Sequence, residues 1–220
     1  MFKQLDNLLG TSDLAALRQI AASARFVDGR ISNPHSKVKN NLHLSDQQAY
    51  QASADILAKA LFGNEEFRNF AFPKRIAPPL ITRYEPGMHY GLHPDSAMMQ
   101  IGKEVLRSDL SCTIFLNEPD SYEGGALRIV LGNATLRFKG PAGSAIVYPS
   151  TTLHEVEKVE SGQRLVAITF IQSQIADDAK RNLLYELNEV AALEGLNMTF
   201  ENYSRLQSVQ FNLLRQWAES

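Results

Sequence analysis

Two histidines and one aspartate stand at spacings that suit a metal site. His93 and Asp95 lie two residues apart in a stretch that also contains Gly91 and Pro94, and His154 follows some sixty residues later. Side chains at positions i and i+2 of an extended segment point to the same face, so His93 and Asp95 could bind one ion. Two imidazoles and one carboxylate leave half of an octahedral ferrous ion open, as dioxygen chemistry requires. These three residues are therefore candidate ligands of iron(II).

Arg164 is a fourth residue that could take part in chemistry. It lies ten residues after His154 and begins an apolar run. A buried guanidinium without a partner is costly, and its planar fork matches a carboxylate with two parallel hydrogen bonds. A dicarboxylate cosubstrate would supply such an anion.

Composition limits the classes of protein to which the chain can belong. Its 220 residues, 44% of them hydrophobic, suffice for one domain with an appendage or for two small ones. The net charge of −2 does not favour a polyanion, so we expect no nucleic-acid partner. The single Cys112 permits no internal disulfide and suits a reducing compartment. The first twenty residues lack a signal-peptide pattern, and no apolar run approaches the ~20 residues that span a bilayer. We expect a cytoplasmic protein that does not contact a membrane.

The spacing of apolar residues predicts two helices near the N-terminus. Apolar side chains recur at three- and four-residue steps over 12–24, with Thr11 or Ser12 as the N-cap. The same spacing over 45–63 starts at Ser45, which forms a capping-box pattern with the glutamine three residues later. Between these helices, residues 27–44 are polar and irregular, which indicates a surface loop or a frayed strand. Residues 37–41 within this loop could line a substrate cleft.

The middle of the chain, 80–172, reads as short antiparallel strands. Its apolar residues alternate with polar ones, and Gly or Pro recurs about every ten residues. Gly132-Asn133 is a two-residue hairpin signal, and Gly124-Gly125 indicates a turn or a bulge before a strand. Cys112 alternates with apolar neighbours, so we expect it in the core. Such a run of strands predicts a double-sheet jelly roll or a barrel.

Helical spacing returns after the strands, over 179–195 and 199–218. Each of these segments carries one apolar stripe. The pair could dock on the β unit or on a second subunit, in which case the protein would be a homo-oligomer.

Several motifs together resemble a known family. They are Tyr84-Glu-Pro-Gly87-Met-His-Tyr90-Gly-Leu-His93-Pro-Asp95, Phe115-Leu116-Asn117, Tyr122-Glu123-Gly124-Gly125-Ala126-Leu127, His154-Glu155-Val156 and Gly162-Gln163-Arg164. They resemble the iron(II)/2-oxoglutarate dioxygenases of the prolyl-4-hydroxylase type and, more narrowly, the bacterial PKHD-type hydroxylases. Further similarity at 26–30, 38–41 and 212–219 extends the resemblance to nearly the whole chain.

The resemblance implies a fold and a set of ligands. The fold is a double-stranded β-helix, so the chain would be mostly β with flanking N-terminal helices and a C-terminal helical pair. Residues 1–172 would form the dioxygenase domain, with the jelly-roll core at about 79–172, and 173–220 a C-terminal helical region. Iron would be bound by His93, Asp95 and His154, and the distal carboxylate of 2-oxoglutarate by Arg164. Tyr90 would contact the cosubstrate through its hydroxyl, and no further catalytic residue is implied.

The resemblance also implies an activity, hydroxylation of a substrate coupled to release of succinate and CO2. The substrate could be a peptidyl residue or a small metabolite. The family is linked to L-ascorbate as a reductant of oxidised iron, although no residue of this chain indicates that dependence. Two other functions fit the same residues: a cupin-like metal-binding protein and a non-catalytic iron and 2-oxoglutarate sensor. Arg164 argues against the first, and succinate release would exclude the second.

Overall fold

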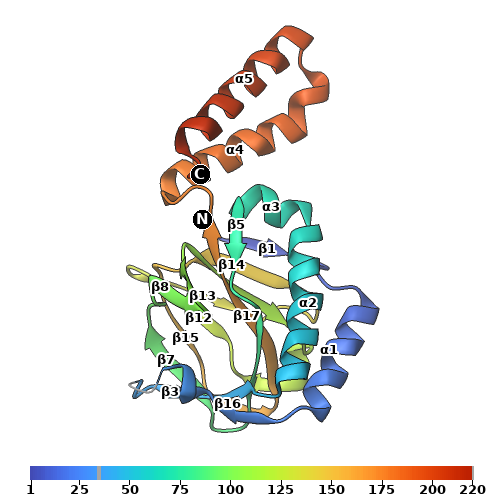
Figure 1. The fold of residues 1–220 in the computed structure, drawn as a ribbon, viewed down its shortest axis with the longest axis vertical. Coiled ribbons are helices and arrows are strands. Elements are labelled where there is room, and N and C mark those ends of the chain that lie inside the picture. Colours follow the sequence, from blue (N-terminus) through green and yellow to red (C-terminus); the bar gives the residue numbers. More distant parts are fainter. Residues whose placement is uncertain (34–35, 220) are drawn as a thin grey trace.

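The protein is described here by a computed structural model, which covers residues 1–33 and 36–219. Two antiparallel β-sheets face each other in the lower half of Figure 1, helices cover one side of them, and a helical hairpin extends from the top. This arrangement confirms the predicted jelly-roll core with flanking helices. Within the described ranges, no helix is both long enough and apolar enough to cross a bilayer.

The larger sheet has eight strands, all paired antiparallel. Its strands in spatial order are β1 (Lys3–Leu5), β14 (Ala145–Pro149), β10 (Leu110–Phe115), β17 (Arg164–Ser173), β6 (Leu80–Tyr84), β4 (Leu42–Leu44) and β2 (Phe26–Asp28), with β5 (Pro73–Ile76) beside one end of β17. Strands far apart in the sequence, such as β1 and β14, therefore lie side by side in one sheet.

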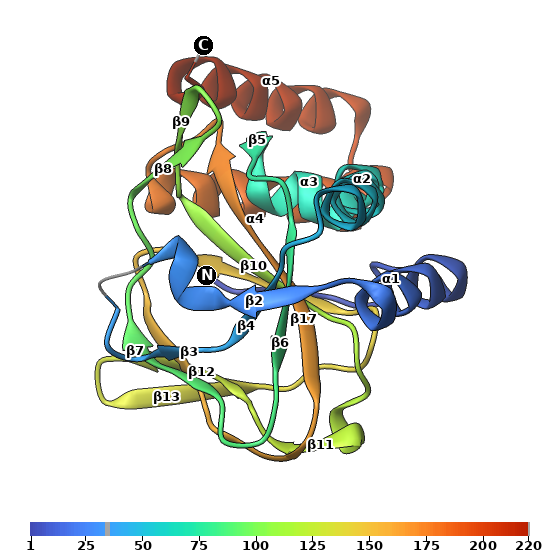
Figure 2. The ribbon, with the colours of Figure 1, turned by 60° about the horizontal axis from the view of Figure 1, so that its bottom comes forward.

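The smaller sheet has five strands, and part of it lies at the lower side of the core in Figure 2. Its strands in order are β13 (Ala134–Phe138), β12 (Leu127–Leu131), β15 (Leu153–Val156), β7 (His89–His93) and β3 (Lys39–Asn40). Two short ribbons complete the strands: β8 (Met98–Ile101) with β9 (Glu104–Arg107), and β11 (Tyr122–Gly124) with β16 (Val159–Gly162).

Alternation along β10 explains how one strand serves two cores. Successive side chains of a strand point to opposite faces of the sheet. Cys112 and Ile114 belong to the apolar cluster that includes residues of the N-terminal helices, whereas Phe115 packs in a second cluster with Ile146 and Val166. The prediction that Cys112 is a core residue is confirmed.

The two predicted N-terminal helices are present, but their caps differ from the prediction. They are α1 (Thr11–Ser23) and α2 (Gln47–Gly63), and a short α3 (Glu65–Ala71), which the sequence analysis did not predict, follows directly. Gly10 is the N-cap of α1 and makes no side-chain bond. Asp46 caps α2 by accepting a hydrogen bond from the Ala49 amide at 2.9 Å. Ser45 instead pairs its amide with the Arg25 carbonyl, so the predicted capping box is wrong.

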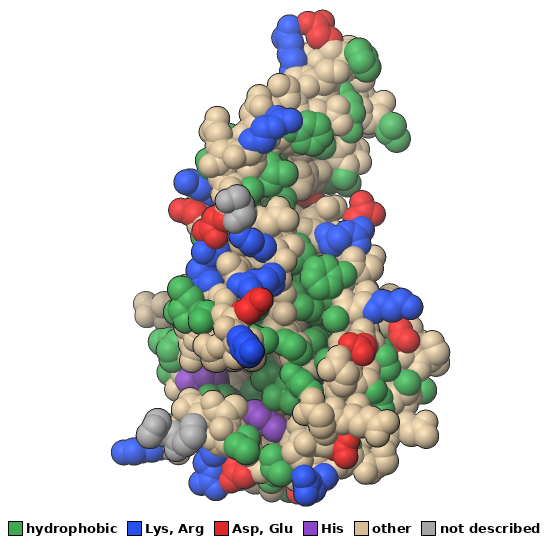
Figure 3. All heavy atoms as spheres, in the orientation of Figure 1, with side chains coloured by type: hydrophobic (Ala, Val, Ile, Leu, Met, Phe, Trp, Pro, Cys, Tyr) green, Lys and Arg blue, Asp and Glu red, His purple; other side chains and the backbone are tan. Residues whose placement is uncertain are grey.

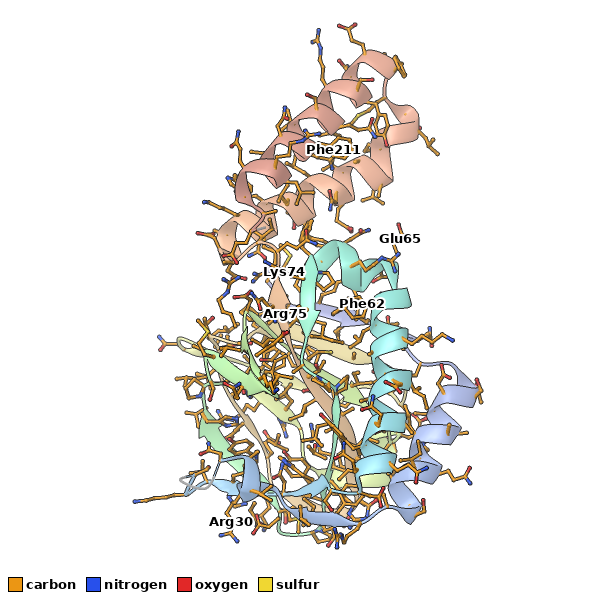
Figure 4. All side chains as sticks on the ribbon, viewed as in Figure 1. Arg30, Phe62, Glu65, Lys74, Arg75 and Phe211 are labelled. Atoms are coloured by element: carbon orange, nitrogen blue, oxygen red, sulfur yellow. The ribbon has the colours of Figure 1, made fainter. Side chains whose placement is uncertain are left out.

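Within 27–44, the described residues 27–33 and 36–44 form more regular structure than the polar sequence indicates. The segment contributes β3 and β4, most of β2, and a 3-10 turn η1 (Gly29–Ser32), which lies near the labelled Arg30 in Figure 4. His43 on β4 is only 4% exposed because it pairs with the central part of β6. Burial lowers the pKa of His43 to about 3, so this histidine is neutral at pH 7. Of the two predicted alternatives, a surface loop is wrong for these residues, and the short strands agree better with a frayed strand.

Glycines shape two of the predicted turns. Gly132 adopts a φ of 59° between β12 and β13, whose register pairs Leu131 with Ala134, and this confirms the two-residue hairpin. The register of β11 against β16 shifts between Glu123 and Gly124, as predicted for a bulge. Gly124 has a φ of 70°, and a Cβ atom there would lie 2.0 Å from the Lys158 carbonyl oxygen. Only glycine fits this position without backbone movement.

The C-terminal helices form a hairpin that stands on α3. They are α4 (Asp178–Glu194) and α5 (Phe200–Trp217), joined by the turn η3 (Gly195–Asn197). The labelled Phe211 in Figure 4 lies on this hairpin, far from the sheets. At the base, the Tyr185 ring meets the Phe70 ring edge-on, with centroids 5.2 Å apart. Glu219 returns to the core, where its carboxylate accepts hydrogen bonds from Arg107.

Candidate metal and cosubstrate site

The three predicted metal ligands lie together between the sheets. One ligand atom of each of His93, Asp95 and His154 lies within 4.8 Å of the other two. The antiparallel register places His93 of β7 opposite His154 of β15, and their ring centroids are 4.4 Å apart. The His154 Nε2 atom is 3.6 Å from the Asp95 Oδ2 atom. Two imidazoles and one carboxylate thus converge on one point.

Hydrogen bonds hold both imidazoles in the form that binds metals. The Nδ1 atom of His93 donates to the Gly91 carbonyl at 2.7 Å, and that of His154 donates to the Thr152 carbonyl at 3.0 Å. Because a carbonyl oxygen can only accept, the proton of each neutral ring sits on Nδ1 and the Nε2 lone pair is free. Burial, and next the neighbouring His154, lowers the pKa of His93. The donor set therefore fits a divalent iron ion.

A chain of serine hydroxyls supports the carboxylate of Asp95. Ser111 of β10 donates a hydrogen bond to the Asp95 Oδ2 atom at 2.6 Å. The Ser111 and Ser150 hydroxyls are 2.7 Å apart, and Ser108 donates to Ser150 at 2.7 Å. All three serines are buried. They link the carboxylate to the larger sheet and restrict its rotation.

We expect the Ser111→Ala protein to bind iron(II) more weakly. Removing an outer hydrogen-bond partner of a metal ligand typically costs about 10- to 100-fold in metal affinity. Anaerobic titration with iron(II), or with cobalt(II) followed by its visible absorption, would measure the change. Ser144→Ala is the matched control, since Ser144 is also buried but donates to the Pro141 carbonyl. Unchanged affinity in Ser111→Ala would show that Ser111 does not orient Asp95.

Tyr90 lies directly against the candidate metal site. Its ring stacks on the His93 ring, with centroids 3.5 Å apart and planes 15° apart. Burial raises the pKa of the Tyr90 hydroxyl, so the phenol is protonated at pH 7 and can donate a hydrogen bond. The stacking fixes the orientation of the His93 ring, a contact that the sequence did not predict.

Arg164 is 1% exposed, and its guanidinium lies beside the hydroxyls of Tyr84 and Tyr122. Its Nε and Nη1 atoms are buried and make no hydrogen bond to the described residues. The guanidinium carbon lies 4.9 Å from the centroid of the Tyr84 ring, and β17 pairs Arg164 with Tyr84. Burial raises the pKa of Tyr122, an effect that the nearby guanidinium opposes. No carboxylate of the described residues pairs with this guanidinium, and a buried guanidinium without an anion is costly, so the arrangement can accept an anion.

One cavity of about 720 Å³ contains the metal ligands, Tyr90 and Arg164. Figure 3 shows histidine side chains at the surface of the β core next to hydrophobic ones, in the lower half of the molecule. The cavity lining also includes residues of η1, β3 and β4, and Met98 and Met99 of β8. The size lies within the usual range for small-molecule sites.

Two lining residues come from the stretch 37–41 that was predicted to line a cleft. Asn41 donates a hydrogen bond to the Tyr84 hydroxyl at 3.0 Å and so helps to place the aromatic ring beside Arg164. Lys39 also lines the cavity. The serines behind Asp95 were not predicted, because no spacing rule distinguishes them from other strand serines.

The jelly-roll fold and a two-histidine, one-carboxylate site define the class of iron(II)/2-oxoglutarate oxygenases. Residues 79–172 match the model of the 2OG-Fe(II) oxygenase superfamily. The chain is 63% identical over 217 residues to a PKHD-type hydroxylase of Sphingopyxis alaskensis, covering 99% of both chains. It is 43% identical to one of Thermosynechococcus vestitus, covering 100% of both. The chain thus belongs to the PKHD-type hydroxylases of this superfamily.

Solved structures share the fold at low sequence identity. A prolyl hydroxylase of Trichoplax adhaerens, in complex with a hypoxia-inducible factor peptide, matches with a TM-score of 0.60 at 16% identity, covering 83% of this chain and 86% of that one. A Pseudomonas putida prolyl-4-hydroxylase matches with a TM-score of 0.54 at 20% identity, covering 78% and 92%. The protein is therefore an iron(II)- and 2-oxoglutarate-dependent dioxygenase, and not a cupin-like metal binder.

Proposed function

We propose that His93, Asp95 and His154 bind the iron of this dioxygenase and that Arg164 binds the distal carboxylate of 2-oxoglutarate. Tyr90 would donate its hydroxyl to the cosubstrate. The observation that supports this assignment best is the pair of unpartnered, buried Arg164 nitrogens in the cavity that also holds the three metal ligands. A metal-binding protein without a cosubstrate would gain nothing from a buried guanidinium.

The bound iron would supply dioxygen activation, coupled to oxidative decarboxylation of 2-oxoglutarate to succinate and CO2. The protein contributes binding and orientation. Arg164 fixes one end of the cosubstrate in a dry environment, where a charge-assisted hydrogen bond is strong. Ser111 and the Gly91 and Thr152 carbonyls orient the ligands. The aromatic rings of Tyr84, Tyr90 and Tyr148 line the cavity and restrict the entry of water.

The substrate of the hydroxylation would be a peptidyl residue or a small metabolite. Proteins of the same fold include both kinds: the Trichoplax adhaerens enzyme was solved with a peptide, and HygX of Streptomyces hygroscopicus with nickel, 2-oxoglutarate and hygromycin B. Either kind would enter through the open side of the cavity.

Binding and turnover experiments test the proposed function. Titrating the anaerobic ferrous protein with 2-oxoglutarate should give the absorption band of an iron-bound 2-oxo acid, at one equivalent per chain. In air, the complex should release succinate, and candidate substrates should accelerate this release. Binding without any succinate release under all conditions would support a sensor. Absence of 2-oxoglutarate binding would refute the assignment.

We also propose the division into a dioxygenase domain, 1–172, and a helical region, 173–220. Buried side chains join the two, among them Phe70 of α3 with Leu184 and Tyr185 of α4. Each large apolar side chain that becomes exposed to water lowers the free energy of unfolding by about 1.5–3 kcal/mol. We therefore expect the 1–172 fragment to melt at lower temperature than the full chain, or to be insoluble. Thermal unfolding followed by circular dichroism measures this.

The control for this stability measurement is the full chain with Phe211→Ser, whose exposed side chain lies far from the domain boundary. A soluble 1–172 fragment with the stability of the full chain would show that 173–220 is an independent module.

Sedimentation of the full chain and of Phe211→Ser tests the proposed homo-oligomer as well, because a dimer formed through the hairpin should dissociate in the variant. A monomeric full chain would exclude it.

A cytoplasmic location remains a proposal based on cysteine chemistry. Cys112 is the only cysteine, and burial raises the pKa of its thiol to about 12. The chain thus has neither a disulfide nor a reactive thiolate, as suits a reducing compartment. Dependence of the activity on L-ascorbate is open to direct assay, with and without the reductant.

A further inference from the structure

Lys39 is a buried cation on the wall of the catalytic cavity. Its strand β3 pairs with β7, and the register sets Lys39 opposite Tyr90. The side chain belongs to a residue that is 8% exposed, and it lines the same cavity as His93 and Asp95. Its ammonium lies 5.2 Å from the centroid of the Tyr90 ring, which itself stacks on His93. The charge therefore lies beside the reaction centre.

No carboxylate within the described residues forms an ion pair with Lys39. The Nζ atom donates one hydrogen bond, to the Ser32 hydroxyl at 2.7 Å, and an ammonium has three N–H donors. Asp28 and Asp95 are close enough to oppose the effect of burial on the pKa of Lys39. However, Asp28 is paired with Arg30, and Asp95 faces His154 and Ser111. Burial prevails and lowers the pKa of Lys39 to about 8.

The charges of the loaded cavity leave one cation without a counterion. Lys39 and Arg164 are the basic side chains of the cavity wall apart from its histidines, and Asp95 is its acidic one. Iron(II) adds two positive charges and 2-oxoglutarate two negative ones. Arg164 would neutralise one carboxylate of the cosubstrate and the metal the other. Asp95 would neutralise part of the charge of the metal. A single positive charge remains, and Lys39 carries it on the wall of the same cavity.

We propose that Lys39 binds a carboxylate of the substrate, so that the enzyme hydroxylates a small carboxylic acid such as a free amino acid or a related metabolite. This inference rests on the proposed function of the site and specifies its substrate class. The cavity volume of about 720 Å³ lies in the range of small-molecule sites, and 2-oxoglutarate would take only part of it. The Tyr90 ring below the ammonium and the Ser32 hydroxyl hold Nζ in place for the anion.

The experiment uses the nickel(II)-loaded protein with saturating 2-oxoglutarate, which binds ligands without turnover. An acetylating reagent at pH 8.5 labels free amines, and mass spectrometry compares Lys39 with the exposed Lys37 in the same peptide. The probes are propionate, propionamide and a capped alanyl-aspartyl-alanine peptide. By mass action, propionate at a concentration of twice its dissociation constant should slow the acetylation of Lys39 about three-fold. Propionamide and the peptide should not, and Lys37 should react equally in all samples.

Each alternative result overturns a defined part of the proposal. Equal acetylation of Lys39 with propionate and with propionamide would show that no anion site exists there. Protection by the capped peptide at lower concentration than by propionate would replace the small acid by a peptide carboxylate.

A second measurement separates Lys39 from the cosubstrate site. The Lys39→Met protein should bind 2-oxoglutarate within about three-fold of the wild-type affinity, because the two carboxylates of the cosubstrate are assigned to Arg164 and to the metal and neither to Lys39. Lys37→Met is the matched control from the same segment. A loss of about ten-fold or more in Lys39→Met alone would assign Lys39 to 2-oxoglutarate and overturn the inference. Failure of the wild-type protein to bind metal or 2-oxoglutarate would instead refute the proposed function.

Discussion

Asp95→Ala and His154→Ala proteins should lose stoichiometric iron(II) binding. Asp95 supplies the carboxylate of the candidate ligand set and His154 one of the two imidazoles. Loss of an outer hydrogen-bond partner already weakens metal affinity by about 10- to 100-fold, so loss of a ligand should cost more than about 100-fold. Anaerobic titration with iron(II), with the metal content measured after gel filtration, gives the affinity directly.

The fold should survive the Asp95→Ala change. Asp95 follows β7 in the chain and its carboxylate is held mainly by Ser111, which keeps its hydrogen bond with Ser150. Thermal unfolding without metal should therefore stay close to the wild type, which separates loss of the site from loss of the protein. Asp120→Ala is the control, since Asp120 is exposed in a turn remote from the ligands. Wild-type iron affinity in both Asp95→Ala and His154→Ala would mean that the metal binds elsewhere.

The sequence could predict that His93 and Asp95 lie close together. It could not predict the strand pairing that brings His154 to them. His93 ends β7 and Asp95 lies two residues beyond it, and the spacing of two that predicted a shared face is a local property of the sequence. That His154 faces His93 follows from the register of β15 against β7, which is decided by packing of the whole sheet. The sequence offered His154 as a candidate ligand, and the structure supplied the physical reason why it faces His93.

The segment that joins the first two helices shows where sequence patterns fail. Its strands are two or three residues long, too short for an alternation to be recognised, and each exists because a neighbouring strand offers hydrogen bonds. His43 is buried for the same reason, although a histidine in a polar stretch is usually exposed. Lys39 likewise reached the cavity wall through the pairing of β3 with β7. Tertiary context overrides local composition in such segments.

The C-terminal hairpin shows a different limit. Its two apolar stripes predicted helices correctly, and the helices pack on each other. Their stripes left open whether the pair covers the sheet, and the structure sets α4 against α3 instead. Large apolar side chains such as Phe200, Leu193 and Phe211 are exposed as a result. An amphipathic stripe defines a face that will be buried, and only the three-dimensional arrangement defines against what.

Changing Arg164 should weaken 2-oxoglutarate without affecting iron. Arg164→Lys keeps a positive charge but loses the planar fork that matches a carboxylate. Loss of one charge-assisted hydrogen bond is worth about 1.5–3 kcal/mol, or roughly one to two orders of magnitude in affinity. Arg164→Met should cost more, because the distal carboxylate would then be buried without a partner beside Tyr84. Methionine retains most of the side-chain packing, so this variant avoids a large cavity.

Titration of the anaerobic ferrous variants with 2-oxoglutarate, followed by the absorption of the complex, measures these affinities. Iron binding should be unchanged in both, since Arg164 is not one of the three residues whose ligand atoms converge. Arg128→Lys provides the control, because Arg128 pairs with Glu155 on the neighbouring strand and does not line the cavity. In the metal-free protein, Arg164→Met removes a buried cation that lacks partners, so the variant should unfold at no lower temperature than Arg164→Lys. If Arg164→Met bound 2-oxoglutarate as tightly as the wild type, the buried guanidinium would have another purpose and the cosubstrate another anchor.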